Sequence, residues 1–78
     1  MTNLRELIID YIKTHSTIAG GVIELNSLTI TILNSDPRNI SIDMINEEID
    51  KLVDENILTW NENNHLITTE YGYKNHFS

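Results

Sequence analysis

The sequence predicts a single α+β domain over residues 1–78, in which helices come first and a β-hairpin follows. Up to Val53, apolar residues recur every three or four positions, which is the period of an amphipathic helix. After Asn56 the period falls to two, as in a strand with one buried face. The composition agrees with a packed domain, because 40% of the residues are hydrophobic. The chain has no cysteine, so no disulfide supplements this core.

Residues 3–14 are expected to form the first helix. Asn3 and Glu6 have the spacing of a capping box. Five apolar residues share one face at i, i+3, i+4, i+7 and i+8: Leu4, Leu7, Ile8, Tyr11 and Ile12. Ile9 points away from this face, so it is either an isolated exposed residue or part of a contact.

Residues 22–33 are ambiguous. The Gly20-Gly21 pair marks a turn before them, because glycine takes positive φ without strain. Helical spacing is shown by Leu25, Leu28, Ile32 and Leu33, and Asn26 or Ser27 could cap such a helix. Residues 28–32 also alternate and are rich in β-branched residues, which favour strands. We expect a short strand over residues 22–24 and then a helix, while a strand over residues 26–34 stays open as the alternative. Residues 34–38 then form a turn, since a residue before proline disfavours helix.

Residues 40–58 contain the strongest helical pattern, and the rest of the chain is organised around it. Ser41 is a good N-cap, and Ile40 and Ile45 have the spacing of a hydrophobic staple. The apolar stripe consists of Ile42, Ile45, Ile49, Leu52 and Val53. The other face carries Lys51 among six acids: Asp43, Glu47, Glu48, Asp50, Asp54 and Glu55. The exposed face of this helix is therefore expected to be acidic.

A β-hairpin is expected after residue 57. Leu58 and Trp60 alternate, residues 61–64 have turn chemistry, and residues 66–68 are extended again. Trp60 is expected to pack at the base of the hairpin, with a partner-facing tryptophan as the alternative. Thr69 is expected to cap a last short helix, whose Tyr73 and Phe77 are spaced to pack onto the core.

This order of helix, strand, helix, helix and hairpin resembles the winged helix-turn-helix superfamily over essentially the whole chain. Residues 45–58 resemble the third helix of the family and its exit into the wing. Asn56 stands where the family often has glycine, and asparagine tolerates the same left-handed cap. Residues 69–72 are similar to the "L-T-x-x-G" that follows the second wing strand, with Thr68 in place of the leucine. The resemblance implies a winged helix: three helices, a short strand, a C-terminal hairpin wing and a short C-terminal helix.

In DNA-binding relatives the third helix enters the major groove and basic wing residues touch the backbone. Carried over by position, the groove-facing residues would be Ser41, Asp43, Met44, Asn46, Glu47 and Asp50. The wing tip would be Glu62, Asn63, Asn64 and His65. None of these is lysine or arginine, although cations supply much of the affinity for duplex DNA. A DNA-binding transcriptional regulator is therefore the alternative function, with contacts at Arg38, Ser41, Asn46, Lys51, Asn63 and His65.

The formal charge of −7 repels phosphate backbones and attracts basic surfaces. We expect a small acidic interaction or regulatory module that binds a protein with a basic surface, as a nucleic-acid mimic or inhibitor. A phage or mobile-element origin would suit such a mimic and the Asn- and Ile-rich composition. The partner contacts are expected at Asp43, Met44, Glu47, Asp50, Lys51 and Asp54. Methionine is included because its flexible side chain suits adaptable interfaces.

Other chemistry has no support in the sequence. His15, His65 and His76 include no pair with the spacing of a metal-binding helix, and the acids match no calcium-binding loop. No serine or histidine has a catalytic context, so we expect no enzyme and no cofactor. The absence of a long apolar run predicts a cytoplasmic protein rather than a membrane protein. A homodimer is a second expected assembly, because so small a core gains stability from association.

Overall fold

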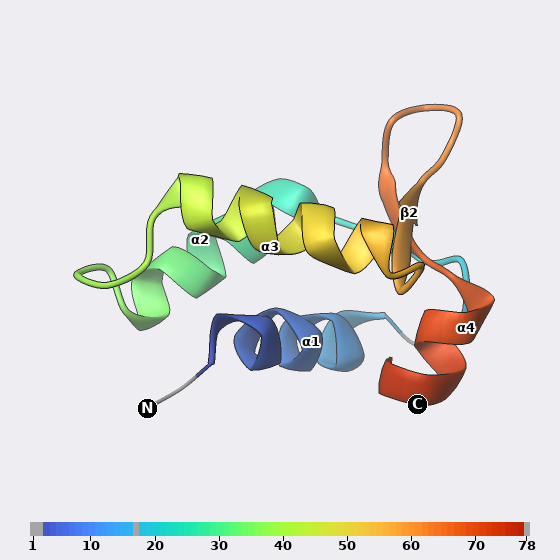
Figure 1. The fold of residues 1–78 in the computed structure, drawn as a ribbon, viewed down its shortest axis with the longest axis horizontal. Helices are drawn as coiled ribbons and strands as arrows, with labels where there is room; N and C mark the ends of the chain where they lie inside the picture. The colour runs from blue at the N-terminus through green and yellow to red at the C-terminus, as the bar shows by residue number, and fades with distance from the viewer. Residues whose placement is uncertain (1–2, 17, 78) are drawn as a thin grey trace.

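Four helices and a small antiparallel sheet make up the computed structural model, which describes residues 3–16 and 18–77 (Figure 1). The elements follow in the order α1 (Leu4–His15), β1 (Val22–Ile23), α2 (Leu25–Ser35), α3 (Ile42–Asp54), β2 (Leu58–Trp60), β3 (Leu66–Thr68) and α4 (Glu70–Gly72), and a π-helical turn (Tyr73–Phe77) continues α4. The predicted α+β class is confirmed. No helix among the described residues is long and apolar enough to cross a membrane.

The first two helices begin differently. Asn3 is the N-cap of α1 as expected, but its Oδ1 accepts a hydrogen bond from the Arg5 amide at 2.8 Å and not from the amide of Glu6, its partner in the expected capping box. The ambiguous segment is a helix, α2, and it buries Leu28 and Ile32. Its expected caps were wrong: the cap position is Glu24, which makes no side-chain capping hydrogen bond. The reason is that β1 ends at Ile23 and α2 already begins at Leu25. Asn26 and Ser27 therefore lie inside the first turn of the helix and not before it.

The three strands pair in the order β1-β3-β2, with both neighbours antiparallel. Trp60 and Ile23 lie on either side of Leu66 in one row of the sheet. The hairpin turn is stabilised by Asn61, whose Oδ1 accepts hydrogen bonds from the Asn63 and His65 amides, both at 2.9 Å. This confirms the predicted hairpin, which rises from the C-terminal end of α3 on the side away from α1 (Figure 1).

The core lies between the three long helices and one face of the sheet. Its buried side chains are Ile8, Ile12, Ile23, Leu28, Ile32, Ile45, Ile49, Leu52, Ile57, Leu58, Leu66 and Phe77. The last helix packs onto this core through Phe77 and the half-buried Tyr73, as predicted. Thr69 caps it by accepting a hydrogen bond from the Gly72 amide at 2.8 Å. Only glycine fits at position 72, since an added Cβ would lie 2.1 Å from the Ile57 carbonyl oxygen.

Two residues lie elsewhere than the sequence pattern suggested, and Ile9 fits the second of its two expected options. Ile42 was expected in the apolar stripe but is 54% exposed, because it is the first residue of α3 and lies at the edge of the buried face. Ile9 is not an isolated exposed residue; it is partly buried against the core, which was the second option. Trp60 was expected to pack at the hairpin base but is 42% exposed. It ends β2, where the strand leaves the core for the turn.

Candidate functional site

The candidate site is the solvent-facing side of α3, whose orientation is fixed by the opposite side. Ile45, Ile49 and Leu52 are buried and anchor the helix. The Ser41 hydroxyl caps its start by accepting a hydrogen bond from the Met44 amide at 3.3 Å. Asn56 has a φ of 62° just after the helix, which is the left-handed conformation expected there. The Ser41 cap, the buried isoleucines and leucine, and the left-handed Asn56 thus fix where α3 begins, which side it buries and where it ends. The orientation of its exposed face is fixed as a result.

The exposed acids of α3 form a continuous stripe. We define the acidic stripe as Asp43, Glu47, Asp50 and Asp54, all of which are exposed. At about 100° per residue, these four side chains fall within an arc of about 60° on the helix surface. Within the described chain, the only salt bridges join Arg5 to two other acids. The stripe therefore presents four carboxylates that no cation of the described structure pairs.

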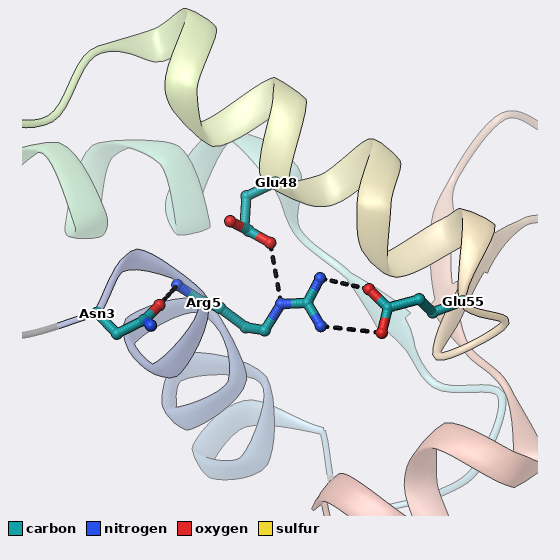
Figure 2. A network of polar contacts seen from close by, with 4 residues as sticks. All are labelled: Asn3, Arg5, Glu48 and Glu55. Atoms are coloured by element: carbon teal, nitrogen blue, oxygen red, sulfur yellow. Dashed lines mark hydrogen bonds and ion pairs between the residues drawn. The ribbon is translucent and has the colours of Figure 1, made fainter.

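Glu48 and Glu55 were predicted to belong to the acidic face, but they have a different role. Arg5 of α1 lies between them (Figure 2). Its Nε donates to Glu48 Oε2 at 2.9 Å, and its Nη1 donates to Glu55 Oε1 at 3.0 Å. Its Nη2 donates to the second oxygen of Glu55. We call these three residues the Arg5 clamp. It uses the planar guanidinium in the bidentate geometry that matches a carboxylate.

The clamp changes the protonation equilibria of its members. Hydrogen bonds from Arg5 lower the pKa of Glu55 below its ordinary value, because they stabilise the charged carboxylate. The hydrogen bonds to Glu55 and Glu48 raise the pKa of Arg5 in turn. One cation thus serves two anions, so the clamp keeps a net charge of −1. The clamp adds to the acidic stripe's potential instead of cancelling it.

Met44 and Lys51 border the acidic stripe. Met44 is 42% exposed and precedes Glu47 by one helical turn, on the side that faces α1. Lys51 is exposed and lies on the helix surface between the stripe and the clamp. The structure therefore brings all six predicted partner-binding residues to one exposed face of α3.

The residues named for DNA contact are not gathered in this way. Arg38 is exposed in the turn between α2 and α3, and Asn63 and His65 are exposed in the hairpin turn. These two turns lie toward opposite ends of the molecule's long axis (Figure 1). Ser41 and Asn46 are exposed on or beside α3, next to the acids. The alternative set is thus a dispersed group with two cations.

Metal chemistry and known relatives add nothing to the site. In the part of the chain that the structure describes, no group of three or more histidine, aspartate or glutamate side chains could hold a metal ion. Comparisons with protein-family models, curated proteins and solved structures give no match to this chain.

The Arg5 clamp was not predicted from the sequence. Arg5 is separated from Glu48 by 43 positions and from Glu55 by 50, and no periodic pattern connects residues so far apart. The only local sign is the spacing of the two acids at i, i+7, which places them on one side of α3. That spacing does not tell which helix provides the cation.

Proposed function

We propose that this chain is an acidic regulatory module that binds the basic surface of another protein through the acidic stripe of α3. The supporting observation is that four exposed carboxylates share one helix face without a paired cation. Arg5, the cation between α1 and α3, is already bound by Glu48 and Glu55. Unpaired surface charge of one sign attracts a partner of the opposite sign and accelerates association.

We also propose that the fold is a winged helix, as the element order suggested. Two features of the structure support this. The short strand β1 joins the C-terminal hairpin in one sheet of order β1-β3-β2, and α3 leads directly into that hairpin through Asn56. In this fold α3 stands where DNA-binding relatives have the helix that enters the major groove. The protein would thus present acids where such relatives present bases.

The spacing of the stripe supports a nucleic-acid mimic. From Asp43 to Asp54 the helix rises about 16 Å at about 1.5 Å per residue, and four carboxylates lie along it. One strand of B-DNA carries about five phosphate charges over that length. A protein groove that neutralises a phosphate backbone with lysine and arginine would therefore meet a similar charge density on α3.

An affinity pull-down with mass spectrometry tests the proposal. The wild type, a Glu47→Lys/Asp54→Lys variant and an Asp10→Lys/Glu70→Lys control are used as baits. The control makes the same change in net charge at exposed positions outside the stripe. We expect a basic protein that the wild type and the control retain and the stripe variant loses. A set of retained proteins that is identical for all three baits would contradict the proposal.

A salt-titrated duplex-DNA binding assay tests the alternative. We expect only weak non-specific binding at physiological salt, with Kd above roughly 10⁻⁴ M. A sub-micromolar complex with a defined site, lost in Arg38→Ala or Lys51→Ala, would contradict the protein-binding proposal. It would establish a DNA-binding regulator instead.

A further inference from the structure

An apolar groove opens beside Met44, at the end of the acidic stripe. It has a volume of about 400 Å³ and lies between the start of α1, the turn after α2 and the start of α3. Its lining residues are Leu4, Leu7, Ser35, Asp36, Asn39, Ile40 and Met44. The leucines and Ile40 are half-buried against the core, so the apolar part of the groove wall is packed onto the core. A groove of this volume is within the range that small ligands and anchoring side chains occupy.

One carboxylate lies among these apolar walls. Asp36 is half-buried, and both of its oxygens accept from Asn39 Nδ2, at 3.1 and 3.2 Å. A carboxylate offers about four acceptor positions, so others remain after this contact. The salt bridges of the described residues do not include Asp36, although Arg38 is two positions away. Asp36 therefore combines partial burial with a negative charge that no salt bridge compensates.

We infer that this groove receives a lysine side chain of the basic partner, which deepens the proposed function and rests on it. Lysine combines an apolar stem with a compact cation. The stem would lie along Leu4, Leu7 and Met44, and the ammonium would reach Asp36. Lysine fits better than arginine, because Asn39 already occupies the side of the carboxylate that faces both oxygens. A planar guanidinium needs that side for bidentate pairing, whereas an ammonium needs a single oxygen.

Charge complementarity and continuity support this occupant. Met44 belongs both to the groove and to the border of the acidic stripe, so one partner surface can contact both. Asp43 and Glu47 neighbour Met44 on the helix and add negative potential at that edge. A partner that presents several cations to the stripe would thus place one of them over the groove.

Peptide titrations followed by NMR test the inference on the 78-residue chain. The probes are a tetralysine peptide, a diaminobutyrate tetrapeptide with the same charge on shorter stems, and a tetra-arginine peptide. We expect tetralysine to bind about fivefold more tightly than the short-stem peptide. It should also shift the methyl signals of Leu4, Leu7 and Met44. Asp36→Asn should weaken tetralysine binding about fivefold, the scale of a surface ion pair.

Matched controls separate the groove from charge in general. Asp10→Asn makes the same change in charge on the exposed part of α1 and should alter tetralysine affinity less than twofold. Met44→Ala shortens the groove wall at an exposed position, so it keeps the test valid if Asp36→Asn disturbs the turn. It should reduce the preference for the longer stem.

Each contrary outcome has a distinct meaning. If all three peptides bind equally and leave the groove methyl signals unchanged, the acidic stripe attracts cations but the groove inference is wrong. Tighter, Asp36-dependent binding of tetra-arginine would overturn the choice of lysine. If no peptide binds, the proposed function fails together with the groove.

Discussion

Glu47 and Glu48 are adjacent on the same helix, yet they belong to two surfaces with different roles. Glu47 belongs to the acidic stripe and is exposed, whereas the side chain of Glu48 is only 16% exposed and is hydrogen-bonded to Arg5. The difference comes from a rotation of about 100° around α3, which turns one carboxylate toward α1 and the other toward solvent. Acids of the same type therefore join two helices on one side of α3 and remain exposed to solvent on the other.

A strongly acidic chain can fold around one shared cation and still keep uncompensated negative charge on an exposed helix face. The Arg5 clamp joins α1 to the middle and the end of α3 (Figure 2), so it fixes the orientation of the helix that carries the stripe. Because the clamp uses one cation for two anions, the fold is stabilised without neutralising the exposed face.

The largest expected loss of stability comes from disrupting the buried side of α3, because that side anchors the helix that carries both the acidic stripe and two residues of the Arg5 clamp. Ile49 is 2% exposed, so Ile49→Asp buries an unpaired charge and should cost about 4 kcal/mol or more. That is comparable with the total stability of a domain of this size, about 4–12 kcal/mol. We expect loss of the cooperative transition in thermal melts followed by circular dichroism. Ile42→Asp is the control, since Ile42 is 54% exposed on the same helix; similar melts for both variants would show that the helix register is wrong.

A smaller loss of stability is expected when only the contacts of the Arg5 clamp are removed. Arg5→Ala leaves Glu48 and Glu55 facing each other's charge without their shared cation. We expect the melting temperature to fall by about 4–8 °C, as for a moderate destabilisation in a domain of this length. The control Lys51→Ala removes an exposed base from α3 and should change the melting temperature by less than about 2 °C. Equal effects would mean that the clamp is only a surface contact.

Acidification should remove the contribution of Glu55 to the folding stability. The folded-state pKa of Glu55 lies below its ordinary value near 4.5, so its contribution to stability is fully present above that value. The contribution is lost as the pH falls from about 4.5 through the folded-state pKa, because the unfolded chain then binds the proton more readily. The difference in melting temperature between wild type and Glu55→Gln should therefore shrink below pH 4.5. A difference that stays constant down to pH 3 would contradict this assignment.

The sequence predicted the stripe but not the clamp, for a physical reason. Helical periodicity depends on neighbours three and four positions apart, so it correctly separated Ile45, Ile49 and Leu52 from the exposed acids. The pairing of Arg5 with Glu48 depends on how α1 packs on α3, which no local pattern contains. For the same reason the exposure of Ile42 was missed, since burial at a helix start depends on where the neighbouring elements end.

The conformation of α2 was also decided by tertiary packing. The β-branched residues of α2 favoured a strand locally, but Leu28 and Ile32 are buried with helical spacing. Tertiary burial therefore outweighed β-propensity, which is the weaker of the two influences. The hairpin was easier to predict, because turn residues such as Asn61 act through their own local hydrogen bonds.

The smallest effect on stability is expected from the stripe itself. In Glu47→Lys/Asp54→Lys, both changed residues are exposed and make no salt bridge with other described residues. The melting temperature should change by less than about 2 °C, or rise because self-repulsion is eased. A large destabilisation would show that the stripe supports the fold, as the clamp does.

The most direct test of the account is the association rate constant of the retained partner, measured by stopped flow across a range of salt concentrations. We expect Glu47→Lys/Asp54→Lys to associate about tenfold more slowly than the wild type at low salt. The difference should narrow as ionic strength shortens the screening length, while Asp10→Lys/Glu70→Lys stays close to the wild type. Equal rates and equal salt dependence for all three proteins would contradict the account, and the binding surface would then have to lie elsewhere, around Trp60 and His65.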